Sequence, residues 1–226
     1  MPSSQYYHIS KLMEMIISLD PKSVLDIGSG FGKFGVLCRE YLELWDGRQK
    51  YEFERRIDCV EVFQKYITPL HKYVYDNIYN ENILDIAPRL NVSYDLILLI
   101  DVLEHFEKND GILLLKTLLQ NHGCILVSTP KIPTPQQDAF GNVYETHRSA
   151  WSMQELQSLG FSAFISDDVS LICLLSSNKK EVDLFNERIK VLKKHGKPPI
   201  EIRLKKIARH IPGASRAYKR LLTIKS

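Results

Sequence analysis

The sequence predicts an α/β fold in which helices cover both faces of a mostly parallel sheet. Short apolar runs that suit buried strands alternate with helical patterns through the first 178 of the 226 residues. One run, residues 24–27, ends in a turn with glycine at alternate positions. Another, residues 94–100, is almost continuously apolar, as is typical of a central parallel strand buried on both faces. The length suits one such domain with a full core, plus an appendage.

Hydrophobic periodicity places the individual elements. Apolar residues recur at helical spacing from Ile9 to Ile16, which predicts an amphipathic helix that ends before Asp20. Two further helices are expected over residues 34–45 and 112–119. Strands are expected at residues 24–27, 57–63, 74–79, 94–100, 123–130, 161–165 and 169–175.

The turn after residues 24–27 has the composition of a nucleotide-type cofactor site. Its glycines let the backbone approach a ligand that a Cβ would exclude, and the next helix begins with free N–H groups. Gly30, Gly32 and Gly35 also fit the dinucleotide pattern G-x-G-x-x-G, so a nicotinamide or flavin cofactor is an alternative. The register argues against it, because Asp26 lies where that pattern should begin. An ordinary glycine-rich turn is a third alternative.

The second predicted strand carries an acid, Glu61, near its end. A carboxylate there can accept the protons of both ribose hydroxyls of a nucleoside. Glu61 follows Gly35 by 26 residues, more than the dinucleotide spacing of about 20. A polar loop over residues 46–56 explains the excess. The alternative is an exposed acid without a ligand.

Two segments together resemble one enzyme family. Residues 25–32, Leu-Asp-Ile-Gly-Ser-Gly-Phe-Gly, resemble the first motif of class I S-adenosylmethionine-dependent methyltransferases. Residues 101–106, Asp-Val-Leu-Glu-His-Phe, resemble the motif after the fourth strand of small-molecule members, including the ubiquinone-pathway O-methyltransferases. The resemblance covers about residues 20–176, with Trp-Ser-x-x-Glu-Leu at residues 151–156.

The resemblance implies a Rossmann-like, doubly wound, seven-stranded sheet whose last strand runs antiparallel between the fifth and sixth. It implies S-adenosylmethionine as the cofactor, with the residue after the third strand at the adenine amino group. Asn82 fits that place better than Asp85, and Asp101 would orient the methionine portion of the cofactor. The expected cofactor contacts are Asp26, Gly28, Gly30, Gly32, Glu61, Asn82, Ile83 and Asp101.

The fourth-strand motif also disfavours nucleobases as methyl acceptors. Enzymes that methylate exocyclic amines of bases usually carry Asn/Asp-Pro-Pro-aromatic there, and cytosine C5 enzymes use a Pro-Cys nucleophile. Neither sequence occurs at this place, and Pro-Cys occurs nowhere in the chain.

A polar and aromatic segment, residues 130–149, follows the fifth predicted strand and holds three prolines. A loop of this length in a compact domain is usually functional or disordered, and its composition favours a substrate lid. Tyr144 and Arg148 are candidate substrate contacts, Arg148 for a phosphate or carboxylate. His105 and His147 are candidate general bases for a hydroxyl acceptor. Acids and histidines show no committed metal spacing in sequence, so no required metal is expected.

Cysteine usage and hydropathy predict a cytoplasmic protein. Cys38, Cys59, Cys124 and Cys173 are widely spaced without a C-x-x-C pair, which predicts reduced core cysteines rather than disulfides or zinc ligands. The longest apolar runs are too short for a membrane span, and no secretory signal is visible.

Charge predicts a boundary between a domain over residues 1–178 and a basic helical extension over residues 179–226. The extension holds 15 Lys/Arg against 4 Asp/Glu, whereas the first 178 residues hold 15 and 23. Residues 182–192 suit packing against the domain or a homodimer contact. Residues 200–222 suit peripheral contact with an anionic membrane at the inner membrane face. Nucleic acid is disfavoured, because the body is acidic and no recognition motif occurs.

Three function classes follow. The leading one is methyl transfer from S-adenosylmethionine to a hydroxyl oxygen of a small molecule or a glycan, including a lipid-linked glycan of polysaccharide biosynthesis. The second is a nicotinamide-dependent oxidoreductase, and the third is a catalytically silent cofactor-binding module. Nothing in the residues identifies the acceptor.

Overall fold

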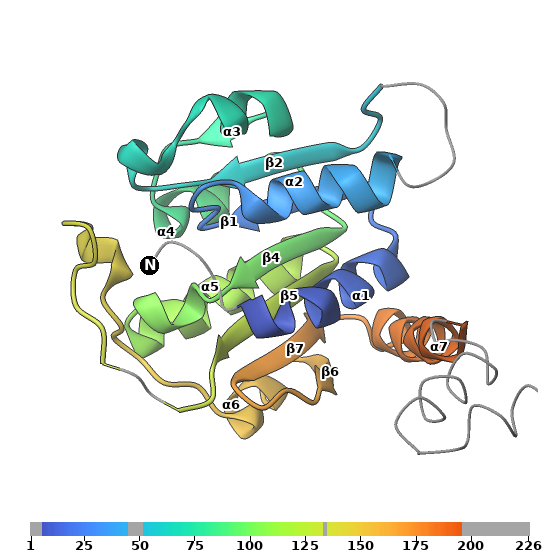
Figure 1. Ribbon diagram of the computed structural model, residues 1–226. Helices are drawn as coiled ribbons and strands as arrows, with labels where there is room; N and C mark the ends of the chain where they lie inside the picture. The colour runs from blue at the N-terminus through green and yellow to red at the C-terminus, as the bar shows by residue number, and fades with distance from the viewer. Residues whose placement is uncertain (1–5, 45–51, 133–134, 196–226) are drawn as a thin grey trace, which may run out of the picture. The chain divides into compact units, whose positions relative to one another are not determined.

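The computed structural model describes residues 6–44, 52–132 and 135–195, and shows a seven-stranded sheet with helices around it (Figure 1). The strand order is β3-β2-β1-β4-β5-β7-β6. The strands are β1 (Ser23–Ile27), β2 (Arg56–Val60), β3 (Ile78–Tyr79), β4 (Leu96–Ile100), β5 (Cys124–Pro130), β6 (Phe161–Ile165) and β7 (Ser170–Ser176). The order reverses direction at β1 and β4, as the predicted doubly wound architecture requires.

The central pairings are parallel. β1 pairs with β2 and β4, and β4 pairs with β5, while all five residues of β4 are buried. β7 runs antiparallel to both β5 and β6, so it lies between them. The predicted seven-stranded sheet with its last strand antiparallel is therefore confirmed.

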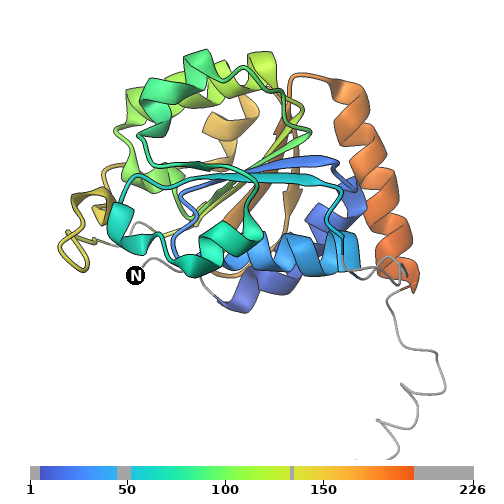
Figure 2. The same cartoon turned by 90° about the horizontal axis from the view of Figure 1, so that it is seen from above.

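Helices cover both faces of this sheet (Figure 2). The helices are α1 (Ile9–Leu19), α2 (Lys33–Arg39), α3 (Pro69–Val74), α4 (Ile83–Ile86), α5 (Lys108–Asn121), α6 (Met153–Gln157) and α7 (Lys179–His195). In Figure 2, α1, α2 and α3 lie on one side of the sheet, and α4, α5 and α6 lie on the other. On that second side, the apolar residues of α5 pack against β1, β4 and β5 in one core cluster. The helices pack on the two faces of the sheet. The edge at which the parallel strands end is therefore not part of the core.

One predicted strand is mostly wrong. Residues 74–79 were expected to be extended, but Val74 ends α3 and only Ile78–Tyr79 forms β3. The helix begins here because Thr68 and His71 form a capping box and Pro69 occupies the first turn, where its missing N–H costs nothing. Tyr75 follows the helix in extended conformation and is buried.

The chain divides into two compact units, Met1–Glu187 and Arg188–Ser226, and the division falls inside α7. The boundary predicted from charge, after residue 178, stays a prediction. Within the first unit, α7 begins at Lys179, and its Val182 and Phe185 are buried. The segment expected to contact a membrane, residues 200–222, lies outside the described residues. None of the described helices has the length and apolar character needed to cross a bilayer.

The cysteines behave as predicted for core residues. Cys38, Cys59, Cys124 and Cys173 are all buried and all free. Burial raises the pKa of each thiol, so the four side chains are neutral packing residues near neutral pH.

Candidate active site

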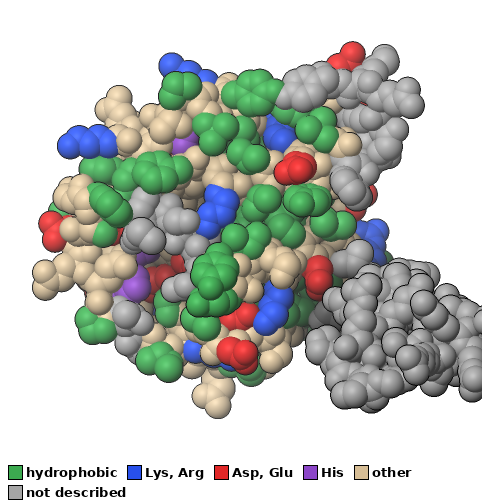
Figure 3. Space-filling model, in the orientation of Figure 1, with side chains coloured by type: hydrophobic (Ala, Val, Ile, Leu, Met, Phe, Trp, Pro, Cys, Tyr) green, Lys and Arg blue, Asp and Glu red, His purple; other side chains and the backbone are tan. Residues whose placement is uncertain are grey.

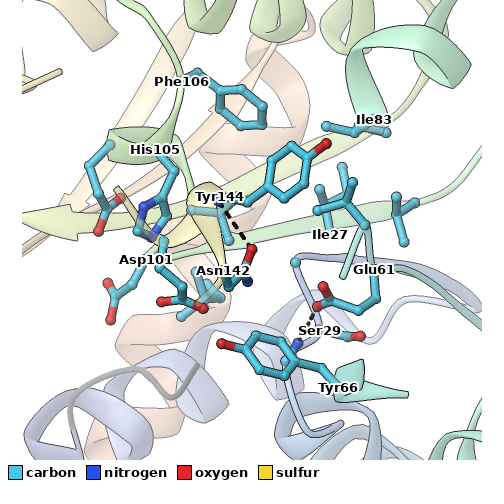
Figure 4. A pocket seen from close by; sticks show the side chains of 18 of the residues that line it. Ile27, Ser29, Glu61, Tyr66, Ile83, Asp101, His105, Phe106, Asn142 and Tyr144 are labelled. Atoms are coloured by element: carbon cyan, nitrogen blue, oxygen red, sulfur yellow. Dashed lines mark hydrogen bonds between the residues drawn. The ribbon is translucent and has the colours of Figure 1, made fainter. Parts of the chain in front are cut away.

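A cavity of about 700 Å³ lies where β1, β2, β4 and β5 end. Its walls include Ile27 and Gly28 after β1, Glu61 after β2, and Asp101 after β4. Parallel strands bring their carboxyl ends to one edge of the sheet, which is where α/β proteins bind ligands. Figure 4 shows two regions of this cavity, with Glu61 on one side and His105 on the other.

The glycine turn lies against the cavity and requires its glycines. Gly28, Gly30 and Gly32 all have positive φ, and at Gly28 a Cβ would lie 2.6 Å from Cγ2 of Val102. That separation is far below van der Waals contact, so a side chain here would push into the residue that follows Asp101. Gly28 and Gly30 line the cavity, whereas Gly32 does not.

Glu61 is held by the backbone on both of its oxygens. Oε2 accepts a hydrogen bond from the N–H of Gly30 at 2.8 Å, and Oε1 accepts one from the N–H of Phe63 at 2.9 Å. The side chain is 4% exposed, and burial raises its pKa to about 7, against the lowering effect of the two N–H donors. The carboxylate is thus oriented before any ligand arrives (Figure 4).

Asp26 does not line the cavity. It is buried behind the turn, where its Oδ2 accepts a hydrogen bond from the hydroxyl of Tyr75 at 2.6 Å. Burial raises the pKa of Asp26 to about 6, while Tyr75 and Lys33 oppose the shift. Tyr75 fits because Gly35 faces it without a Cβ, which would lie 2.4 Å from the ring. The structure therefore gives Asp26 a packing partner, and its predicted cofactor contact stays a prediction.

The other predicted cofactor residues line the cavity. Asn82 caps α4, its Oδ1 accepting a hydrogen bond from the N–H of Leu84 at 3.0 Å, and Ile83 follows it. Asp101 has a φ of 53°, a strained conformation for a residue with a side chain. Its carboxylate accepts a hydrogen bond from the hydroxyl of Ser128, and its N–H donates to the Ser128 carbonyl at 2.8 Å. Asp101 is therefore fixed by β5 at the junction of the two regions.

Both candidate bases lie on the far side of the cavity from Glu61. The rings of His105 and His147 are edge to face, with centroids 4.9 Å apart. Nδ1 of His105 lies 3.2 Å from the Thr146 carbonyl, which assigns the proton to Nδ1 and leaves Nε2 as an acceptor. Burial lowers the pKa of His105 to about 4, so the ring is neutral near neutral pH.

A third side chain joins this pair. One ligand atom each of Glu104, His105 and His147 lies within 4.8 Å of the others, a grouping that could hold a metal ion. Burial raises the pKa of Glu104 to about 8, and the nearby charge of Asp101 adds to the shift. The sequence suggested no such group because 42 residues separate His105 from His147.

The predicted lid lies against this region. Backbone N–H groups of Arg148 and Ser149 donate to the Glu104 carbonyl at 2.8 and 3.1 Å. The guanidinium of Arg148 donates to the carbonyls of His105, at 2.9 Å, and Val143, at 3.0 Å. Arg148 thus ties the loop to the motif after β4, in addition to lining the cavity where it was expected to contact substrate.

Two residues that line the cavity, Tyr66 and Asn142, carry no sequence signal for a role (Figure 4). Tyr144, which was predicted to contact substrate, lines the cavity as well. Lys33 adds a cation whose pKa is lowered by burial and raised by Asp101 and Asp26. Lys33 directly follows the glycine turn, and Glu104 lies within the motif at residues 101–106. Their positions in the sequence could therefore have identified both as site residues.

Comparison by sequence gives no relatives: no family model matches the chain, and no curated protein matches it. Solved structures do match. The N-terminal domain of EvdMO1 with SAH bound aligns at a TM-score of 0.55 and 10% identity, over 77% of this chain and 83% of that one. An O-methyltransferase family protein from Burkholderia thailandensis aligns at 0.50 and 12% identity, over 76% and 57%.

An rRNA methylase from Escherichia coli also aligns, at a TM-score of 0.50 and 18% identity, over 76% of this chain and 64% of that one. The chain thus spans less than two thirds of the length of the Burkholderia and Escherichia proteins. At such identities the likeness concerns the fold. The strand order and these alignments together show that the chain has the fold of class I S-adenosylmethionine-dependent methyltransferases.

Proposed function

We propose that the chain transfers a methyl group from S-adenosylmethionine to a hydroxyl oxygen. The observation that carries this proposal is one cavity with a glycine turn and a backbone-held carboxylate in one region and two imidazoles in the other. Solved proteins of this fold, such as the EvdMO1 domain, are described with SAH bound. The cofactor, when bound, supplies an electrophilic methyl group on a sulfonium.

The cofactor region suits a nucleoside. Glu61 is oriented to accept the two ribose hydroxyls, and Ile83 offers an apolar surface for adenine beside Asn82. At Gly28 and Gly30 the absence of side chains lets the ligand approach the protein backbone closely. Asp101, which lines the same cavity, would hold the amino group of the methionine portion, because a carboxylate suits that group.

The acceptor region suits a hydroxyl. Nε2 of His105 can accept a proton, because its Nδ1 donates to Thr146. Tyr144, which is 44% exposed, lines the mouth and offers an aromatic face to a sugar or another small molecule. Methyl transfer is an in-line displacement, so these residues act mainly by aligning the acceptor oxygen. A small molecule or a glycan, including a lipid-linked glycan, fits this composition.

One face of the molecule gives no support to a nucleic-acid acceptor. On the face drawn in Figure 3, Lys/Arg side chains of the described residues are scattered among apolar and Asp/Glu side chains and form no continuous basic area. A phosphate backbone needs such an area, because binding to it depends on releasing counterions from many contacts.

Calorimetry on the full chain tests the cofactor. SAH should bind one to one and NAD should not, whereas the reverse result would favour a nicotinamide-dependent oxidoreductase. Labelled S-adenosylmethionine should then transfer its methyl group into a fractionated extract that includes the lipid fraction. Binding of SAH without transfer into any fraction would favour the catalytically silent module.

A further inference from the structure

We propose that Glu104, His105 and His147 form a binding site for a divalent first-row transition metal ion. The metal site itself needs no methyltransferase activity, but its role at the acceptor rests on the proposed function. It departs from the expectation of no required metal, because the fold brings together residues that the sequence separates.

The first step is geometric. Glu104 and His105 belong to a short 3-10 helix, Leu103–His105, directly after β4, and His147 comes from the loop after β5. Ligand atoms of all three lie within 4.8 Å of one another. Metal–ligand bonds of about 2.0–2.2 Å place ligand atoms about 3–4 Å apart, so small side-chain rotations close the site.

The second step concerns a buried oxygen that lacks a hydrogen bond of standard geometry. Glu104 is 3% exposed, and its Oε2 has no hydrogen-bond partner of standard geometry among the described residues. The hydroxyl of Thr129, also buried and without a partner of standard geometry, is near enough to act on the Glu104 carboxyl. A buried polar oxygen without a well-formed hydrogen bond is costly. A metal ion bound by Glu104 would supply the missing partner.

The third step concerns orientation of the other ligands. The Thr146 carbonyl accepts a hydrogen bond from Nδ1–H of His105, which leaves Nε2 to bind a metal. Backbone carbonyls commonly orient metal-ligating histidines in this way. The loop that carries His147 is tied to the same motif, through the N–H groups of Arg148 and Ser149 on the Glu104 carbonyl. The ring of His105 and the backbone that carries Glu104 and His147 are thus held in place by the protein itself.

The types of ligand indicate which metal ion binds and what chemistry it would support. Two imidazoles and one carboxylate favour Mn²⁺, Co²⁺ or Zn²⁺ over Mg²⁺ and Ca²⁺, which prefer oxygen ligands. Three protein ligands leave coordination positions open toward the cavity. An acceptor hydroxyl in an open position would release its proton to water near neutral pH. Water would then take the place of Nε2 of His105 as the proton acceptor, because the metal would occupy the lone pair of that nitrogen. Its oxygen would then form the O–C bond as the S–C bond breaks, and the electron pair of that bond would stay on sulfur.

The test is Co²⁺ binding by the untagged full chain after removal of metals with a chelator. Calorimetry should show one tight site, and the visible absorption of bound Co²⁺ should report the coordination. Glu104→Gln and His147→Ala should each weaken binding at least about 10–100-fold, because the loss of even a group that only orients a metal ligand costs that much. Asp138→Asn is the matched control, because Asp138 is an exposed acid on the same loop outside the group, and it should bind as the wild type does.

SAH binding separates this proposal from the proposed function. Both variants should keep wild-type SAH affinity, since Glu61 lies in the other region, and this also shows that they are folded. Co²⁺ affinity unchanged in both variants, or absent from the wild type, overturns the metal site. If Co²⁺ binds as expected but SAH does not bind, the metal site stands and the methyltransferase proposal falls. His147→Ala, on the partly exposed loop, remains decisive if Glu104→Gln fails to fold.

Discussion

Two buried carboxylates of the same cavity are held in different ways. Glu61 is 4% exposed and accepts hydrogen bonds from two backbone N–H groups, so both of its oxygens are oriented without a ligand. Glu104 is 3% exposed, and its Oε2 has no hydrogen-bond partner of standard geometry among the described residues. The first side chain is ready for neutral hydroxyl donors. The second has an oxygen open to another ligand, so the two regions should respond to different ligands.

The two regions also differ in how the chain builds them. The Glu61 region comes from strand ends and from the turn that directly follows β1. The Glu104 region needs a loop that returns across the end of β5, tied by Arg148 to the carbonyls of His105 and Val143. Substitutions in one region should therefore leave binding in the other unchanged.

The largest effect is expected from Gly28→Ala. The residue has a φ of +68°, and its new Cβ would meet Cγ2 of Val102 at 2.6 Å. Backbone strain of about 1–2 kcal/mol and overpacking of about 1–3 kcal/mol should together lower the free energy of unfolding by about 3 kcal/mol. Urea denaturation measures this change, and SAH binding should be lost at the same time.

Gly141→Ala is the matched control for that substitution. Gly141 has nearly the same φ, +67°, but a Cβ there would meet nothing within 4 Å. Its cost should be the backbone strain alone, about 1 kcal/mol. Equal losses of unfolding free energy in the two variants would show that Val102 moves away from the new Cβ. Backbone strain would then account for the whole loss.

Glu61→Ala should weaken SAH binding by about 2–3 kcal/mol, because two charge-assisted hydrogen bonds to the ribose disappear. Calorimetry on the variant measures this directly. Co²⁺ binding should be unchanged, as the comparison of the two regions requires. Unchanged SAH affinity would remove Glu61 from the cofactor site.

SAH affinity should also rise with pH through the titration of Glu61. Burial raises the pKa of Glu61 to about 7, and the charges of Glu145 and Asp26 add to the shift. Only the ionised form accepts both ribose hydroxyls, so affinity should increase about tenfold from pH 6 to pH 8, or about 1.4 kcal/mol. In the free protein the sign is opposite: a raised carboxyl pKa lowers stability as pH rises from the usual 4.5 toward 7.

Glu61→Gln separates this titration from that of Asp26, whose pKa burial raises to about 6. The variant should bind SAH more weakly and with a flat pH profile over that range. A profile as steep as the wild type's would assign the dependence to Asp26 or to another group.

The fold was predicted well, and most residues predicted to contact the cofactor line one cavity, because their signals are contiguous. The apolar run of β4 directly indicates a buried strand. The alternate glycines before α2 directly indicate positive φ. Glu61 stands at a strand end, and strand ends gather at one edge of a parallel sheet. Local composition is therefore enough for that region.

Elsewhere the signals are not local. Asp26 has the position of a cofactor contact, but Tyr75, 49 residues later, takes its carboxylate. Tyr75 directly follows α3, the helix that begins at Thr68 and takes up the start of the predicted third strand. The approach of His147 to Glu104 is set by backbone hydrogen bonds of the loop, which no side-chain pattern encodes. Tertiary contacts of this kind explain what the sequence could not predict.

The smallest effect is expected from Arg148→Met, which tests how the loop reaches the motif after β4. The guanidinium bridges the carbonyls of His105 and Val143, and methionine keeps the apolar stem but donates to neither. Losing this bridge should free the loop and lower Co²⁺ affinity about fivefold, the equivalent of one net hydrogen bond of about 1 kcal/mol. Lys116→Met, an exposed change on α5 outside the cavity, is the control for the lost charge. SAH affinity should stay at the wild-type value, because no contact of Glu61 involves Arg148. Wild-type Co²⁺ affinity in Arg148→Met would show that the backbone bonds to Glu104 hold the loop alone, and parallel losses of Co²⁺ and SAH affinity would show that the two regions are coupled.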